Sequence, residues 1–416
     1  MTDPIPLNGD GRSSPQFMTM LGALLGVAMG LSNALGYLLV MLLSRTLGPE
    51  DFGGYTALTT LGVLLEIPAG AFQVVVARRL AEGNPREQTT GLRLAVGVSL
   101  TLFGVTSVAS AGLRDVFAVA SVWSPILMGA MLVPMTVTGC LQGILLGSHR
   151  LRALSALYVV TAVTRLTAAV AAALGGFSVV QVFAAMLVAA IVTAGFGVAL
   201  CRQELRAIGR TGHHLVGEML RSNSTLAALT ALTSIDVLLA RHYLSAHDSG
   251  GYALASTFGR AICWGTQFIA LIVVPRMRDT DAHRALLKAS GLVLGIGIFG
   301  LLIVSVNPGF WVRAAGGAEY ADYGRVAQAC VVLGIAWALA QVWLFSEMGA
   351  GKQLLGLLTW VAVAAEVATV ALLWHSNAVQ IVIVCTACAG FISVAGLVSV
   401  TSRARRAGAA AGSHPR

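Results

Sequence analysis

Long apolar runs, each separated from the next by charged or turn-forming residues, dominate the chain. A helix needs about 20 apolar residues to cross a hydrocarbon layer roughly 30 Å thick. Runs of that length predict twelve transmembrane helices, at about 18–44, 55–77, 92–113, 117–147, 153–175, 178–201, 223–244, 252–275, 286–306, 323–346, 353–374 and 378–400. The pattern therefore predicts an all-α polytopic membrane protein.

The composition fits a chain whose main solvent is lipid. Of the 416 residues, 56% are hydrophobic and only 11% are charged, whereas a soluble domain carries roughly 25% charged residues. The six cysteines lie almost all in apolar runs, where they act as small hydrophobic residues. Cys385 and Cys388 form a C-x-x-C without a nearby histidine, so we expect helix packing there and no metal site.

The distribution of positive charge orients the spans. The chain holds 27 lysines and arginines against 18 acidic residues, a net charge of +9. With a cytoplasmic amino terminus, twenty of the 27 fall in cytoplasmic segments and five in external loops, as the positive-inside rule describes. We therefore expect a multi-pass protein of the cell (cytoplasmic) membrane with both termini in the cytoplasm. Its positive charge then faces anionic lipid headgroups and not nucleic acid.

The spans group into two halves of six. The longest internal connection, from Cys201 to Arg221, has apolar and charged residues at helical spacing and joins the sixth span to the seventh. The predicted organisation is a cytoplasmic N-terminal tail (1–16), an N-lobe (17–201), a cytoplasmic amphipathic linker (202–221), a C-lobe (222–400) and a basic cytoplasmic tail (401–416).

An internal repeat relates the two halves. The first span ends in LLSRTLGPEDFGGYTAL and the seventh in LLARHYLSAHDSGGYALA, so that Arg45 matches Arg241 and the G-G-Y at 53–55 matches that at 250–252, about 197 positions later. Because each half has an even number of crossings, both halves share one orientation. We therefore expect two parallel six-helix lobes around a central cavity.

The motifs resemble those of the polysaccharide exporters, or O-antigen-type flippases, of the multidrug/oligosaccharidyl-lipid/polysaccharide exporter superfamily. The turn RTLGPEDFGGY is similar to that family's R-x-L-G-x-x-x-F-G-x-Y. GGAEYADYG at 316–324 is similar to its G-x-x-Y stretch before helix ten, and EMGAGK at 347–352 to its polar turn after that helix. The resemblance covers the whole chain in helix number, lobe division and loop placement.

What the resemblance implies is a flippase that works by alternating access of two lobes. Its substrate would be a polyprenyl-pyrophosphate-linked oligosaccharide, moved from the inner to the outer leaflet for cell-surface polysaccharide biosynthesis. The implied partners are this lipid-linked oligosaccharide, membrane lipids and other polysaccharide-assembly proteins. No cofactor is expected, and a coupling ion, H+ or Na+, is left open.

Five charged residues fall in the interior of the predicted spans, away from their ends, where an unpaired charge costs roughly 2.5–3.5 kcal/mol on insertion scales. Substrate- or ion-binding candidates are Glu66, Arg165, Asp236, Arg260 and Glu366. The second and fifth spans hold Glu66 and Arg165, and the repeat-equivalent eighth and eleventh hold Arg260 and Glu366, with the signs exchanged. We therefore predict one ion pair per lobe, which either ties helices together or acts on cargo or ions.

Two further residues near these charges have predicted roles. Asp236 lies close to Arg241 and His242 in the sequence, an arrangement that predicts an anchor for the external end of the seventh span. Pro68, beside Glu66, loosens the helix backbone and is a candidate hinge.

Other functions remain open. An ion-coupled multidrug or metabolite exporter of the same superfamily would use Glu66, Asp236 or Glu366 as a proton or sodium site, and a non-transporting scaffold would recruit partners through the linker or the basic tail. A major-facilitator carrier is disfavoured because ARRLAEGNPREQTTG lacks that group's G-x-x-x-D-[RK]-x-G-[RK] pattern. An enzyme is not expected, since the chain has no P-loop, H-E-x-x-H or clustered metal ligands.

The predicted orientation is testable by labelling single introduced cysteines in intact cells. A cysteine at Ser376 should react with an impermeant thiol reagent added outside, because the eleventh and twelfth spans meet there on the external side. A cysteine at Gly212, in the linker, should react only after the cells are permeabilised. External labelling at Gly212 would contradict the topology.

Overall fold

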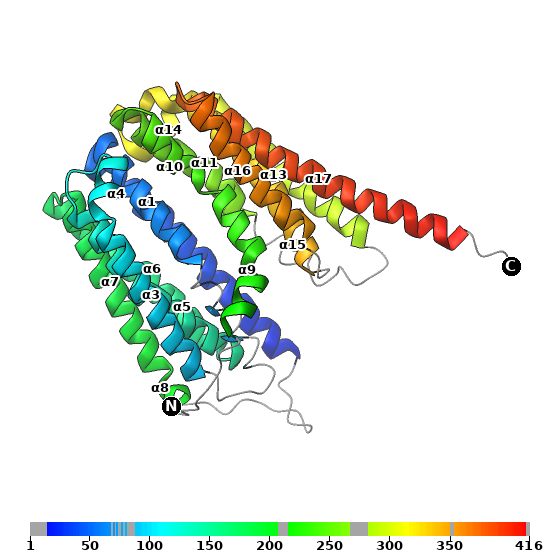
Figure 1. Cartoon of the computed structure of the whole chain (residues 1–416), viewed down its shortest axis with the longest axis horizontal. Coiled ribbons are helices and arrows are strands. Elements are labelled where there is room, and N and C mark those ends of the chain that lie inside the picture. Colours follow the sequence, from blue (N-terminus) through cyan, green and yellow to red (C-terminus); the bar gives the residue numbers. More distant parts are fainter. Residues whose placement is uncertain are drawn as a thin grey trace. The chain divides into compact units, whose positions relative to one another are not determined.

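The computed structural model describes residues 15–67, 70, 72–73, 76–77, 80, 88–206, 215–266, 282–349 and 353–412, and these residues form helices and their connections (Figure 1). In the first half, the helices are α1 (Pro15–Leu65), α3 (Gln88–Val108), α4 (Ser110–Val116), α5 (Trp123–Gly147), α6 (Leu151–Gly175), α7 (Val179–Leu200) and α8 (Arg202–Arg206). In the second half they are α9 (Leu215–Leu232), α10 (Ile235–Tyr243), α11 (Ala246–Gly265), α13 (Ala282–Val306), α14 (Pro308–Gly316), the 3-10 helix η3 (Ala318–Tyr323), α15 (Gly324–Gly349), α16 (Leu354–Leu372) and α17 (Ala378–Gly412).

The described helices make this a multi-pass membrane protein. Nine helical segments of the described residues are long and apolar enough to cross a bilayer, α9 and α10 together counting as one of them, or ten if the bent pair formed by α3 and α4 counts as one span. Many large apolar side chains are exposed along these helices, for example Val188 and Leu294, as expected for surfaces that lipid covers.

The difference from the twelve predicted spans has identifiable sources. The first two predicted spans are joined in α1, which is broken only at Gly48, where φ is 70° and ψ is 172°. Part of the second span, with the hinge candidate Pro68, and the end of the eighth lie outside the described residues. The eighth span corresponds to α11, which is not among the nine.

Two predicted spans and one connection differ from the structure in detail. The fourth span begins at Trp123 and not near 117, and runs as one helix of 25 residues with Pro134 inside it. The seventh is not one helix, since α9 ends at Leu232 and α10 begins at Ile235. Residues 207–214 of the predicted linker lie outside the described part of the chain.

The chain forms two compact units. Unit 1 comprises residues 1–43, 65–110 and 123–221, and unit 2 comprises 44–64, 111–122 and 222–416. In unit 1, a buried apolar cluster joins α3, α5 and α6, with Leu141, Ile144 and Leu157 fully buried. In unit 2, α15 lies at the centre of the packing, against α11, α13 and α17 (Figure 1).

Glycines set the close approach of α11 and α15 inside unit 2. A Cβ atom on Gly334 would lie 2.1 Å from the carbonyl oxygen of Gly259, and one on Gly259 would lie 2.1 Å from that of Cys330. The backbones therefore touch, as small residues allow in membrane helices. This contact fixes α11, which carries the charged site described below.

The helix contact predicts different outcomes for two glycine substitutions. Gly334→Ala forces α11 and α15 apart and should destabilise the protein by about 1–3 kcal/mol, the usual cost of overpacking. Gly295→Ala, on the exposed face of α13 with no atom within 4 Å of its Cβ position, is the matched control and should be neutral or slightly stabilising. Thermal unfolding of the purified variants in detergent measures both, and equal midpoints would contradict the close contact.

Candidate functional site

A break in the seventh predicted span creates the polar site of unit 2. Between α9 and α10, the backbone N–H groups of Thr233 and Ser234 donate to Leu229 and Ala231, which closes α9. Asp236 then falls in the first turn of α10. A broken transmembrane helix leaves carbonyls that need other donors, and the Thr233 carbonyl finds one in Arg260.

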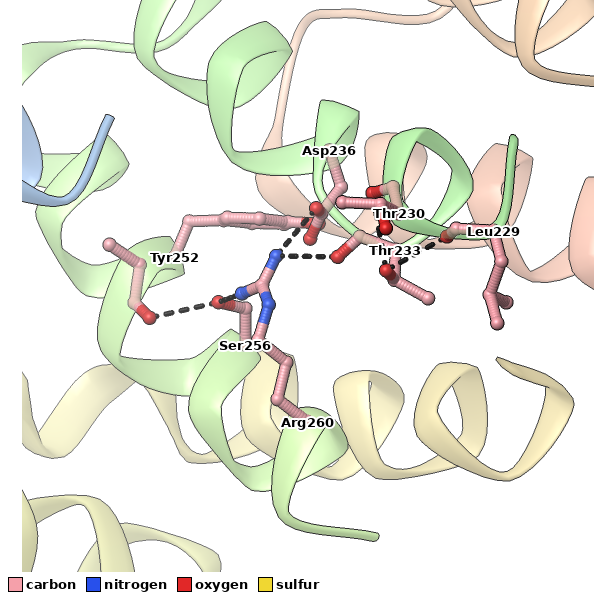
Figure 2. Close-up of polar contacts among 8 residues, drawn as sticks. Leu229, Thr230, Thr233, Asp236, Tyr252, Ser256 and Arg260 are labelled. Atoms are coloured by element: carbon pink, nitrogen blue, oxygen red, sulfur yellow. Dashed lines mark hydrogen bonds and ion pairs between the residues drawn. The ribbon is translucent and has the colours of Figure 1, made fainter. Parts of the chain in front are cut away.

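Arg260 and Asp236 form a buried ion pair (Figure 2). Nη2 of Arg260 donates to Oδ1 of Asp236 at 2.8 Å and to the Thr233 carbonyl at 3.0 Å. The Asp236 side chain is fully buried, and that of Arg260 is 18% exposed. The hydroxyl of Tyr252 donates to Oδ2 of Asp236 at 3.0 Å. Asp236 therefore has a donor on each oxygen, which is the condition for burying a carboxylate.

The guanidinium of Arg260 is held on two further sides. Its Nη1 donates to Oγ of Ser256, one turn earlier on α11. The guanidinium carbon lies 5.5 Å from the centre of the Trp337 ring of α15, in the range of a cation–π contact. Arg260 is thus committed to its own unit in this structure.

Glu366 is buried without a comparable set of partners. Its side chain is fully buried on α16, neither carboxyl oxygen has an N–H or O–H donor among the described residues, and the thiol beside it, that of Cys385, is only a weak donor. The ionisable groups around it are the thiols of Cys385 and Cys388 on α17 and the carboxyl of Asp236 on α10. Burying a carboxyl without a cation or a strong donor is costly, which marks Glu366 as a candidate functional residue.

The predicted pairing of Arg260 with Glu366 is wrong in this structure. Arg260 pairs with Asp236, because the helix break brings Asp236 and the free Thr233 carbonyl together beside α11. The predicted association of Asp236 with Arg241 and His242 is also wrong, since its partners are Arg260 and Tyr252. The comparison of equivalent positions in the repeat correctly predicted that Glu366 lies near this site, but its side chain does not pair with Arg260.

The other predicted pair lies in unit 1. Glu66 and Arg165 are near enough to interact through space, but no hydrogen bond or ion pair joins them among the described residues. Both side chains are half-buried. The direct pair predicted from the sequence is therefore not formed here, and Arg165 has no hydrogen-bond or ion-pair partner in the described part of the chain.

Sequence reasoning predicted Arg260 but missed Tyr252, Ser256, Trp337 and the Thr233 carbonyl, although one signal was available for the first two. Tyr252, Ser256 and Arg260 are spaced four residues apart, which places them on one face of α11. Tyr252 is also the tyrosine of the repeated G-G-Y motif, which was interpreted only as a marker of the repeat. Trp337 gave no signal, since its contact depends on the packing of α15.

Comparison with solved structures shows which class of protein has this fold. An inward-facing multidrug resistance transporter of the MATE family, in the MOP superfamily, matches with a TM-score of 0.72 and 15% identity over 89% of this chain and 94% of that one. The lipid II flippase MurJ in an inward closed conformation matches with a TM-score of 0.72 and 10% identity over 91% and 87%. A MOP superfamily transporter from Pyrococcus furiosus matches with a TM-score of 0.60 and 14% identity over 93% and 96%. The fold is that of a MOP-superfamily transporter.

The sequence itself places the chain in a family. The family model described as polysaccharide biosynthesis protein matches residues 22–281, more than half of the chain. This protein therefore belongs to the polysaccharide biosynthesis protein family, and its fold is similar to that of MOP-superfamily transporters. Among curated proteins, none matches the chain. The resemblance inferred from the sequence motifs is confirmed.

The ion pair predicts a non-additive response to charge removal. Arg260→Gln leaves Asp236 buried and unpaired and should cost about 3–5 kcal/mol of stability, and Asp236→Asn should behave similarly. The double variant removes both charges and should be more stable than either single variant. Thermal unfolding in detergent measures the cycle.

The control for this cycle is Arg114→Gln. Arg114 pairs with Asp115, and their side chains are 48% and 69% exposed, so its loss should cost about 0–1 kcal/mol. Additive losses in the Asp236 and Arg260 cycle would show that the two charges do not stabilise one another.

Proposed function

We propose that this protein is a flippase that moves a polyprenyl-pyrophosphate-linked oligosaccharide from the inner to the outer leaflet during cell-surface polysaccharide biosynthesis. The observation that carries the proposal is membership of the polysaccharide biosynthesis protein family. The likeness of the fold to the lipid II flippase MurJ supports it, because that protein is itself a flippase of a lipid. Membrane lipids and other polysaccharide-assembly proteins are the proposed partners.

The proposed architecture is the one expected from the repeat. Twelve helices form an N-lobe (17–201) and a C-lobe (222–400) of parallel orientation around a central cavity, with both termini in the cytoplasm. Nine or ten described spans and the match to MOP-superfamily folds support this arrangement. Alternating access of the two lobes then exposes the cavity to one leaflet at a time.

Arg165 is the proposed contact for the pyrophosphate. Arg260 is committed to Asp236, Ser256 and the Thr233 carbonyl, whereas Arg165 is half-buried and has no hydrogen bond within the described residues. A guanidinium binds phosphate oxygens in a fork, and a lipid pyrophosphate needs such a group within the membrane. Glu66 interacts with the Arg165 guanidinium through space. Bound pyrophosphate would replace that weaker interaction.

A second candidate function is ion-coupled export of a drug or metabolite. The observation that favours it is Glu366, a carboxyl buried on a candidate membrane span with no N–H or O–H donor among the described residues. Such acids often mark proton or sodium pathways in transporters. Glu366 also serves the flippase proposal, as a site for a coupling H+ or Na+.

The flippase proposal predicts where the precursor accumulates. Cells without the protein should hold lipid-linked oligosaccharide on the inner leaflet, protected from periodate and an impermeant hydrazide added outside spheroplasts. Arg165→Gln should give the same result at normal membrane levels, and Arg165→Lys should recover part of the activity because it keeps the charge but not the fork. The exposed Arg114→Gln is the control and should leave the distribution unchanged.

An export role predicts a different pattern. Loss of the protein, or Glu366→Gln, would raise susceptibility to cationic dyes while surface polysaccharide and its lipid-linked precursor stay normal. That result would replace the flippase proposal.

A further inference from the structure

Two segments of the first half of the chain belong to unit 2. Residues 44–64 and 111–122 group with residues 222–416, although the rest of the first half belongs to unit 1. Contacts inside unit 2 therefore join the first half to the second. The segment 44–64 carries the first copy of the repeat motif, and its contacts involve the second copy directly.

Arg241, in the second copy of the motif, binds backbone of the first half. Its Nε donates to the carbonyl of Phe117 at 2.7 Å, and its Nη2 to that of Ala118 at 2.9 Å. Nη1 donates to the carbonyl of Glu50 at 3.1 Å and to Oγ of Ser249 at 2.8 Å. The side chain is only 5% exposed, so these bonds form out of contact with water.

Arg45, in the first copy, binds backbone of the second half. Its Nε donates to the carbonyl of Ala315 at 3.2 Å, and its Nη2 donates to that of Ala314. The carbonyls at 117–118 follow the third predicted span of the first half, and those at 314–315 follow the third of the second half. Both loops then turn through a positive φ, 44° at Ala118 and 103° at Gly317. The two arginines thus make the same contact reciprocally.

The glycines of the two motifs allow the backbones to meet. A Cβ atom on Gly250 would lie 1.8 Å from the carbonyl oxygen of Pro49. One on Gly53 would lie 2.9 Å from both Nη1 of Arg241 and the backbone nitrogen of Gly250. The repeated G-G-Y is therefore a contact between the two halves as well as a marker of the repeat.

Tyr320 of η3 adds an apolar contact between the halves. Its hydroxyl donates to the carbonyl of Ser44 at 3.1 Å, and its ring meets that of Phe52 edge to face, with centroids 6.4 Å apart. Both rings are 1% exposed. Phe52 is therefore shielded only while the segment 44–64 stays on the second half.

The end of η3 is fixed within the second half. The hydroxyl of Tyr323 donates to Asp248 at 2.7 Å, and that of Ser245 donates to the other oxygen of the same carboxyl at 2.7 Å. Asp248 precedes the eighth predicted span, and these two hydrogen bonds hold the pKa of its carboxyl below the usual range. The end of η3, close in sequence to the carbonyls that accept from Arg45, is thus held to α11 by bonds that do not involve Arg45.

We propose that Arg45 and Arg241, together with the carbonyls at 117–118 and 314–315, form the closed gate of the transport cycle on the side predicted to be external. We call this set the arginine clasp. In the state that opens to that side, both arginines release the opposite half, and the segments 44–64 and 111–122 separate from the second half. Arg45 and Arg241 are positioning residues and do not contact cargo. The inference rests on the transport cycle proposed above.

The chemistry of the clasp suits a gate. A guanidinium offers five N–H donors in a fixed plane and bonds two adjacent carbonyls without rearrangement. When the clasp opens, water replaces each bond at little net cost, so the closed state is favoured but reversible. Each half holds the other through an equivalent arginine, so breaking the bonds of one arginine leaves those of the other in place. The two halves separate only when both sets of bonds break together, which makes opening cooperative.

The test uses a cysteine in place of Phe52 as a reporter of opening. Purified protein in detergent is treated with N-ethylmaleimide, so neither cargo nor orientation enters the measurement, and labelled peptides are quantified by mass spectrometry. Arg45→Gln and Arg241→Gln should each raise the labelling rate at position 52 by about tenfold or more, from loss of charged hydrogen bonds. Arg313→Gln, which removes an exposed arginine of α14, is the matched control and should leave the rate unchanged.

Native cysteines distinguish opening from unfolding. Cys263, Cys330 and Cys385 of unit 2 are at most 1% exposed and should stay unlabelled in every variant. Unchanged labelling at position 52 would overturn the proposal. Parallel labelling of the native cysteines would also overturn it, because the arginines would then hold the fold and not a gate.

A reversible lock gives a second, independent measurement. A disulfide-forming bifunctional reagent between cysteines at Phe52 and Tyr320 should keep the clasp closed, which stops glycolipid movement until reductant is added. Movement that continues at full rate through the cross-link would contradict the gate. If labelling at position 52 responds as expected while the distribution of lipid-linked oligosaccharide between the leaflets is unaffected, the arginine clasp is supported and the proposed cargo is contradicted.

Discussion

A charge inside the membrane is stable only with partners, and the structure of unit 2 follows from satisfying one such charge. Asp236 is fully buried and holds Arg260 and Tyr252 on its two oxygens. Arg260 in turn satisfies the carbonyl that the break before α10 leaves free. The break, the polar face of α11 and the position of Trp337 over the guanidinium therefore form one arrangement. Removing either charge leaves the other without compensation.

Much of the fold was predictable because lipid imposes a simple rule on sequence. Apolar runs of sufficient length located the spans, and the motif around Gly53 and Gly250 revealed the repeat. What the sequence could not show was the interruption of the seventh span at Thr233, since residues 223–244 are apolar throughout most of their length. The predicted pairing of Arg260 with Glu366 was wrong for the same reason. The break of two residues brings Asp236 to the position beside Arg260 that was predicted for Glu366.

The repeat has two meanings, and only one is visible in sequence. As a pattern, it shows that the two halves are similar in sequence, which predicts a common orientation. As a structure, it brings two like surfaces together, since Arg45 and Arg241 each cross to the loop that the other half supplies. Self-complementary contacts of this kind are usual at interfaces between identical subunits. Here they occur within one chain, although the charged residues in the spans have diverged in sign between the halves.

Both arginines bind main-chain oxygens and no side chain of the loops they hold. Ala314, Ala315, Phe117 and Ala118 contribute carbonyls that any amino acid would offer. The identity of these loop residues is thus free to vary as long as the backbone path is kept. We therefore expect sequence constraint to concentrate on the two arginines and the glycines beside them, whereas the side chains of the two loops can change.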